Sequence, residues 1–135
     1  MKHLKKIFES TTTLIKDLYS NEFKDMIIDE FEFKIEYDMT QITITKDIDV
    51  NNDDINVTII FKPDQSKVIA EYEYIGEITT GYTEATYQDP AEWSSEEHIE
   101  EGKKEFHKVE DIYDWLGDLD YTISENISGQ YGEEY

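Results

Sequence analysis

Four oxygen-bearing side chains at two-residue spacing could ligate a metal ion: Asp47, Asp49, Asn51 and Asp53. They match positions 1, 3, 5 and 7 of a calcium-binding loop. The match fails where the geometry of such a loop is most demanding, because position 6 is Asn52 instead of Gly and position 12 is Thr58 instead of a bidentate Glu. The flanking residues also alternate like strands. We therefore predict a hairpin turn and no metal site here, with weak binding of cations to the clustered carboxylates left open.

The three histidines do not form a recognisable ligand set. His3, His98 and His107 belong to no HExxH or ExxH pattern. His98 lies among glutamates that could attract a divalent metal: Glu96, Glu97, Glu100 and Glu101. We predict instead that His98 is a surface residue whose pKa is raised by the neighbouring acids.

Motifs for covalent or cofactor chemistry are missing from the sequence. There is no Cys, no G-x-S-x-G, no phosphate-binding loop and no G-x-G-x-x-G. Pairs of carboxylates are abundant, but general acid–base catalysis needs one of them in a pocket of low dielectric constant. The sequence does not indicate which acid is enclosed. We expect no cofactor and no enzymatic activity.

Hydrophobic periodicity indicates the elements of the first two thirds of the chain. Residues 3–19 carry an apolar stripe at helical spacing, and a short helical turn follows from Asn21 to Ile28. Alternation with period two then predicts strands at residues 30–38, 42–48, 57–62 and 68–75, and a Thr-rich strand at 78–87. Short turns between them favour an antiparallel meander.

The last third is predicted to be helical. Asp89-Pro90 ends the sheet, and the charged residues 92–108 favour a helix that Gly102 weakens. Residues 109–127 form an amphipathic helix, and residues 128–135 are expected to fray. The sequence thus predicts one α+β domain over residues 1–127, an antiparallel sheet of four to five strands with an N-terminal and a C-terminal helix packed on it.

Charge is the most informative property of the chain. It has 33 Asp and Glu against 12 Lys, no Arg, and a formal net charge of −21 in 135 residues. A small domain stays soluble with a net charge of about 2–8, and a larger excess costs folding free energy through self-repulsion. Residues 1–69 carry a net charge of −5 and residues 70–135 carry −16. A cationic partner explains this excess best.

Two predicted elements carry acids at regular spacing. On the 30–38 strand they are Glu30, Glu32, Glu36 and Asp38, and on the 109–127 helix they include Glu110, Asp111, Asp114 and Asp118. Such rows could imitate the regular negative charge of a nucleic-acid backbone. Glu71 and Glu73 are a second acidic patch. Trp115 is a candidate anchor of the partner interface, and the tyrosines Tyr72, Tyr74, Tyr82 and Tyr87 are core or sheet-face residues that would suit an interface where they are exposed among acids.

In size, acidity, lack of Cys and these acidic rows, the chain resembles small DNA-mimic inhibitors, the class that includes anti-CRISPR, anti-restriction and uracil-DNA glycosylase inhibitor proteins. The resemblance implies a stoichiometric inhibitor that occupies the DNA- or RNA-binding cleft of a nuclease or another nucleic-acid-binding protein. One alternative is an immunity protein or antitoxin that neutralises a basic toxin. Another is a regulatory or structural domain whose acidity only keeps it soluble.

Location and further partners follow from the same features. Polar residues interrupt the apolar positions of residues 1–20, so we expect no signal peptide there, and the sequence has no run of 18 apolar residues of the kind that spans a membrane. We expect a cytoplasmic protein, in the host cell if it is phage-encoded. It should bind neither nucleic acid directly nor anionic membranes, because both would repel it.

Overall fold

A computed structural model describes residues 14–64 and 66–131. Residues 14–18 are helical, followed by the short helix α2 (Asn21–Asp25) and one π-helical turn, η1 (Met26–Glu30). Five strands and a long helix complete the chain: β1 (Lys34–Tyr37), β2 (Ile42–Val50), β3 (Asp53–Asp64), β4 (Lys67–Thr83), β5 (Glu92–Phe106) and α3 (Val109–Tyr131). The helix predicted over residues 3–19 lies mostly outside the described residues.

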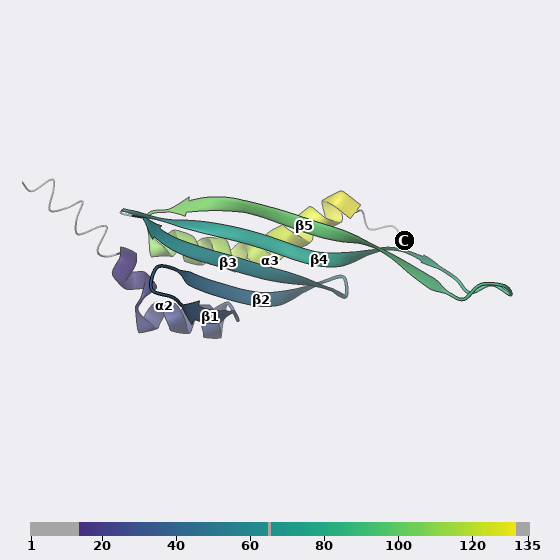
Figure 1. The fold of residues 1–135 in the computed structure, drawn as a ribbon, viewed down its shortest axis with the longest axis horizontal. Helices are drawn as coiled ribbons and strands as arrows, with labels where there is room; N and C mark the ends of the chain where they lie inside the picture. The colour runs from purple at the N-terminus through teal and green to yellow at the C-terminus, as the bar shows by residue number, and fades with distance from the viewer. Residues whose placement is uncertain (1–13, 65, 132–135) are drawn as a thin grey trace, which may run out of the picture.

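The strands form one sheet in chain order, β1-β2-β3-β4-β5, and every neighbouring pair is antiparallel. Figure 1 shows α3 running along one face of this sheet, with α2 beside the β1 edge. The predicted α+β fold with an antiparallel meander is therefore confirmed.

The β2–β3 connection is a two-residue turn. Asn51 and Asn52 have φ values of 54° and 72°, the left-handed conformation that a tight hairpin turn requires at both central positions. The backbone N–H of Asn52 donates to Oδ1 of Asp49 at 2.8 Å. The predicted hairpin turn is confirmed.

Four elements differ from the prediction. Residues 68–87 were predicted as two strands, but β4 is continuous from Lys67 to Thr83. The segment 92–108 was predicted to be helical, but its residues Glu92–Phe106 form strand β5. The strand predicted at 30–38 begins only at Lys34, because η1 ends at Glu30 and Glu32 has a φ of 60°. Helix α3 also continues to Tyr131, four residues beyond its predicted end.

The core lies between α3 and one face of the sheet. On α3 the predicted apolar stripe is buried: Val109, Ile112, Leu116, Leu119, Ile123 and Ile127. It packs on alternate residues of the central strands, including Ile44, Ile59 and Tyr74. We call this side the inner face of the sheet. On the outer face none of the residues of β2 to β5 that lie in register is buried.

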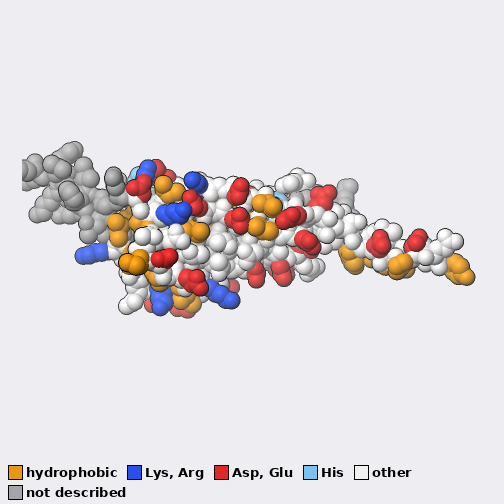
Figure 2. Space-filling model, in the orientation of Figure 1, with side chains coloured by type: hydrophobic (Ala, Val, Ile, Leu, Met, Phe, Trp, Pro, Cys, Tyr) orange, Lys and Arg blue, Asp and Glu red, His pale blue; other side chains and the backbone are white. Residues whose placement is uncertain are grey.

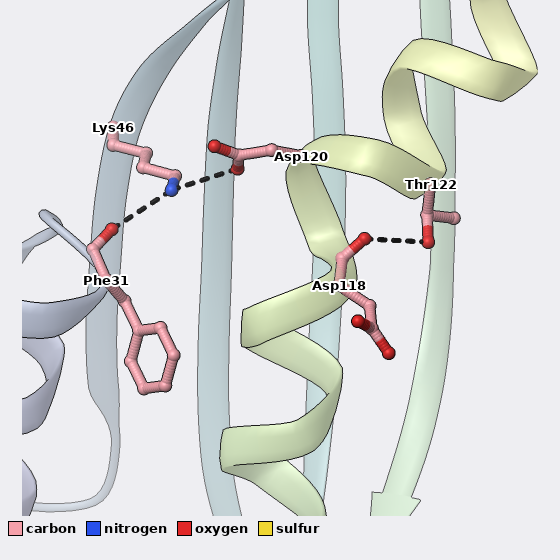
Figure 3. A network of polar contacts seen from close by, with 5 residues as sticks. All are labelled: Phe31, Lys46, Asp118, Asp120 and Thr122. Atoms are coloured by element: carbon pink, nitrogen blue, oxygen red, sulfur yellow. Dashed lines mark hydrogen bonds and ion pairs between the residues drawn. The ribbon is translucent and has the colours of Figure 1, made fainter.

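Lys46 is a charged residue on the inner face. Its side chain is 12% exposed, and its Nζ donates to the carbonyl oxygen of Phe31 at 3.0 Å and pairs with Oδ1 of Asp120 at 3.0 Å (Figure 3). The ammonium also lies 4.5 Å from the centroid of the Phe33 ring. Lys46 of β2 therefore connects two other parts of the fold through its ammonium group. One is the segment that precedes β1, and the other is α3.

Candidate functional site

Seven exposed carboxylates gather on the outer face of the sheet, over the part of β2 to β5 that leads toward the β4–β5 hairpin. We call them the acidic sheet face: Asp47, Asp49, Asp54, Glu73, Glu77, Glu97 and Glu101. None of them forms an ion pair with a Lys or His of residues 14–64 and 66–131. Asp47 accepts a hydrogen bond from the side-chain amide of Asn56 at 3.0 Å. The field of these carboxylates is thus not neutralised locally.

The sheet register places like charges directly opposite one another. Glu73 is the cross-strand partner of Glu101, Glu77 of Glu97, and Asp49 of Asp54. Opposed like charges destabilise a sheet, by roughly 0.2–1 kcal/mol a pair. Three such pairs on one face are an arrangement that folding alone does not favour.

An apolar pair interrupts the acidic sheet face. Ile75 lies opposite Ile99, between the Glu73–Glu101 and Glu77–Glu97 pairs. The Ile99 side chain is 55% exposed. Protein–protein interfaces combine an apolar centre with a polar rim.

The opposite end of the same face is electrically balanced. Glu71 pairs with Lys62 at 2.9 Å and with Lys103 at 3.5 Å, and the hydrogen bond from Lys62 lowers the pKa of Glu71. Glu105 pairs with Lys67 at 2.7 Å, which likewise lowers the pKa of Glu105. Figure 2 shows this division, with blue side chains gathered at one end of the molecule and red ones extending toward the other.

A hollow of about 520 Å³ lies where the two regions meet, lined by Thr58, Ile60, Glu71, Glu73, Glu101 and Lys103 among others. Glu73 and Glu101 are exposed, and the hydrogen bond from Lys62 lowers the pKa of Glu71, so none of these three carboxylates has the apolar surroundings that raise the pKa of a general acid.

Strands β4 and β5 continue beyond the body of the sheet as a two-stranded projection (Figure 1). We call residues 79–95 the arm. It begins at an irregularity in the pairing between Thr79 and Gly81, and Thr79 is anchored by Asp53, which accepts from both its N–H and its hydroxyl at 2.9 and 2.8 Å. The arm presents Tyr82, Tyr87 and Trp93 to solvent.

The predicted acids of the last helix are exposed as expected. Glu110, Asp111, Asp114 and Asp118 all lie away from the buried stripe of α3. Because α3 covers the inner face, this row lies on the side of the molecule opposite the acidic sheet face. Glu71 and Glu73 are therefore not an extension of the helix row, and one flat partner surface could not contact both.

Trp115, predicted as an interface anchor, is partly buried and packs against aromatic side chains of the sheet. Its ring centroid lies 5.3 Å from that of Phe106 and 5.8 Å from that of Tyr72, and Nζ of Lys104 lies 5.5 Å from the ring. Gly102 makes this packing feasible, because a Cβ at that position would lie 2.6 Å from Cζ of Tyr72.

The acidic row predicted on the 30–38 strand does not exist as a row. Glu30 ends η1, Glu32 lies in the connection, Glu36 is in β1 and Asp38 follows it. All four are exposed. The positive φ of Glu32 breaks the alternation on which the prediction depended.

His98 is buried, not a surface residue as predicted. It is 3% exposed because position 98 falls on the inner face of β5, and its Nε2 lies 3.6 Å from Oε2 of Glu100. The other carboxylate oxygen of Glu100 accepts from Nδ2 of Asn126, on α3, at 3.1 Å. Across residues 14–64 and 66–131, no group of three or more His, Asp or Glu side chains is placed to hold a metal ion.

Sequence reasoning missed Trp93 and Ile99, since both fall in the segment that was predicted as a helix. The sequence feature that could have indicated them is the position of two aromatic residues, Tyr82 and Trp93, on either side of the Asp89-Pro90 turn.

No helix of the described residues is long and apolar enough to cross a membrane. Comparisons with family models, curated proteins and solved structures give no match for this chain.

Proposed function

We propose that this protein is a non-catalytic binding protein whose acidic sheet face occupies the phosphate-binding surface of a basic nucleic-acid-binding protein, such as a nuclease, and so inhibits it. It would act stoichiometrically and in the cytoplasm. It would not bind nucleic acid itself, because a chain of net charge −21 repels a phosphate backbone.

The observation that carries the proposal is the set of like-charged cross-strand pairs, Glu73–Glu101, Glu77–Glu97 and Asp49–Asp54. At one end of the same face, acids are neutralised by ion pairs with Lys62, Lys67 and Lys103. We assign these ion pairs a role in stability alone. At the other end the pairs are left repulsive and exposed. A cationic partner would convert this repulsion into attraction upon binding.

The exposed Ile99 supports an interface in preference to an acidity that only maintains solubility. Solubility is served by any spread of charge and gains nothing from an apolar side chain among glutamates. In a complex, the glutamates would steer a basic partner and raise the association rate, whereas Ile75 and Ile99 would slow dissociation.

The exposed acids of α3, Glu110, Asp111, Asp114 and Asp118, are a second candidate surface for the partner.

Two triple variants with the same charge change test which of the two surfaces binds the partner. One replaces Glu73, Glu97 and Glu101 with Lys, and the other replaces Asp111, Asp114 and Asp118 with Lys. The parent and both variants are assayed at 50 mM salt for displacement of labelled DNA or RNA from purified nucleases, toxin nucleases and other nucleic-acid-binding proteins.

The parent should displace nucleic acid from at least one of these proteins at stoichiometric concentration. The sheet-face variant should associate at least tenfold more slowly than the α3 variant, which controls for net charge. The reverse order would assign the partner to α3. Failure of the parent to displace nucleic acid from any of them at low salt would favour a solubilising role for the acidity.

A further inference from the structure

The arm carries a compact group of exposed aromatic side chains. Tyr82 and Trp93 are cross-strand partners with ring centroids 4.5 Å apart, and they are 47% and 70% exposed. Tyr87 at the tip is fully exposed. Large aromatic side chains left together in solvent are unfavourable for an isolated protein and mark an interaction site.

The geometry of the pair leaves ring faces free. The Tyr82 and Trp93 rings are tilted by 42°, so they touch without covering one another. The aromatic contacts found for them are with each other, and neither belongs to the hydrophobic core. Each ring can therefore stack on a further flat group.

The arm is held in shape up to its tip. The N–H of Thr86 donates to the carbonyl oxygen of Asp89 at 2.7 Å, and the N–H of Asp89 donates to Oγ1 of Thr86 at 3.0 Å. Asp53 fixes its base through Thr79. These contacts lower the conformational entropy that binding would otherwise cost.

The negative charge of the arm indicates which kind of partner surface its aromatic side chains could contact. The arm carries Glu84, Asp89 and Glu92, and residues 68–102 contain 10 Asp and Glu and not a single Lys or Arg. A second copy of this chain would be repelled by the same charges. A cationic groove would not be.

We propose that the arm enters a groove that binds single-stranded nucleic acid, with the rings of Tyr82, Trp93 and Tyr87 in the place of bases and the arm carboxylates in the place of phosphates. Such grooves combine basic side chains that follow the backbone with aromatic or Arg platforms on which bases stack. Proteins that bind only the outside of a duplex contact phosphates and groove edges and offer no such platforms. The inference rests on the proposed function and narrows it to one class of partner.

The test uses two matched panels, purified single-strand-binding proteins carrying a labelled oligothymidylate and purified duplex-binding proteins carrying a labelled duplex. The full chain competes as the parent, as the Tyr82→Ala/Trp93→Ala variant, and as the Tyr82→Phe/Trp93→Phe variant. Tyr121→Ala removes an equally exposed aromatic from α3 and is the control. Thermal melts establish that each variant is folded.

We expect displacement from a member of the single-strand panel, with the alanine pair at least tenfold weaker and the phenylalanine pair close to the parent. In a Trp115→Phe background, Trp93 is the remaining Trp, and its fluorescence should shift to the blue and become protected from acrylamide in the complex. Equal competition by parent and alanine pair, or displacement from duplex-binding proteins alone, would overturn the inference and leave the proposed function standing. No displacement from either panel would overturn both.

Discussion

Glu73 lies directly opposite Glu101 in the β4–β5 register, and both carboxylates are exposed on the outer face of the sheet. Four residues further along β5, on the same face, Glu105 is paired with Lys67 at 2.7 Å. Glu101 and Glu105 are both exposed and lie on the same face of the same strand, but Glu101 faces another carboxylate and Glu105 faces a Lys. We therefore expect Glu105 to stabilise the fold and Glu101 to destabilise it.

Glu101→Lys should therefore stabilise the protein. The substitution turns a repulsive cross-strand pair into an attractive one, and we expect a gain of about 0.5–1 kcal/mol in the free energy of unfolding. Urea denaturation in 50 mM salt measures it, and the gain should shrink in 500 mM salt as the charges are screened. Glu105→Lys is the matched control and should have the opposite sign, since it places a Lys beside Lys67. A loss of stability in both variants would show that the pairing of charges does not matter on this face.

The β2–β3 turn offers a second test. Asn52 has a φ of 72°, a conformation that glycine adopts without the steric cost of a side chain. Asn52→Gly should raise the free energy of unfolding by up to about 1 kcal/mol, whereas Asn52→Val should lower it. Stabilisation by valine would contradict the left-handed turn.

Calcium should have little effect on the same segment. The carboxylate of Asp49 accepts from the N–H of Asn52, and Asp47 accepts from Asn56, so both are engaged in the hairpin. Addition of millimolar calcium should leave the melting temperature nearly unchanged. Saturable binding at micromolar calcium that disappears in Asp49→Ala would show that the segment is a metal site after all.

The sequence predicts a helix or strand at nearly the correct position where one face of that element is apolar. Ile42, Ile44 and Ile48 in β2 and the stripe of α3 alternate with the period of their own element, and both were predicted at nearly correct positions. In β5 this signal is absent. Its inner face carries Glu96, His98, Glu100, Gly102 and Lys104 before Phe106, so neither face looks buried, and the strand exists because β4 supplies a complete set of backbone partners.

Gly76 explains why β4 was predicted as two strands. A glycine inside an apolar alternation indicates a break, yet here it permits close packing, because a Cβ would lie 2.7 Å from the carbonyl oxygen of Asp54. The acidic sheet face depends on the same pairing. Glu97 and Glu101 join Glu73 and Glu77 only when β5 lies beside β4, which no local pattern encodes.

Alkaline pH should reveal the burial of Tyr113. This residue packs against Phe23 and Phe31, and burial, with the charge of Glu22 nearby, raises the pKa of its phenol to about 12. In the unfolded chain the phenol ionises near pH 10. The neutral ring therefore contributes its full stability below about pH 10, and this contribution is lost as the pH rises toward 12.

Melting temperatures at pH 8, 10 and 11 test this expectation. Tyr113→Phe cannot ionise, so its melting temperature should fall less between pH 8 and 11 than that of the parent. Tyr87→Phe, which changes a fully exposed ring, should behave as the parent does. The same fall in all three proteins would mean that ionisation of Tyr113 does not contribute.

The acids of α3 differ in their role in the fold. Asp118 has no ion pair within the described residues, whereas Asp120, two residues later, pairs with Nζ of Lys46 at 3.0 Å (Figure 3). Asp118→Lys should change the free energy of unfolding by about 0.5 kcal/mol or less, as exposed sites usually do. Asp120→Lys makes the same charge change but leaves the nearly buried Lys46 without its counter-ion and beside a second cation. It should cost about 1–3 kcal/mol. Urea denaturation of the two variants at one salt concentration gives the comparison. If Asp120→Lys is as stable as Asp118→Lys, Lys46 does not hold α3 to the sheet, and the carbonyl of Phe31 is then the partner that keeps this cation in place.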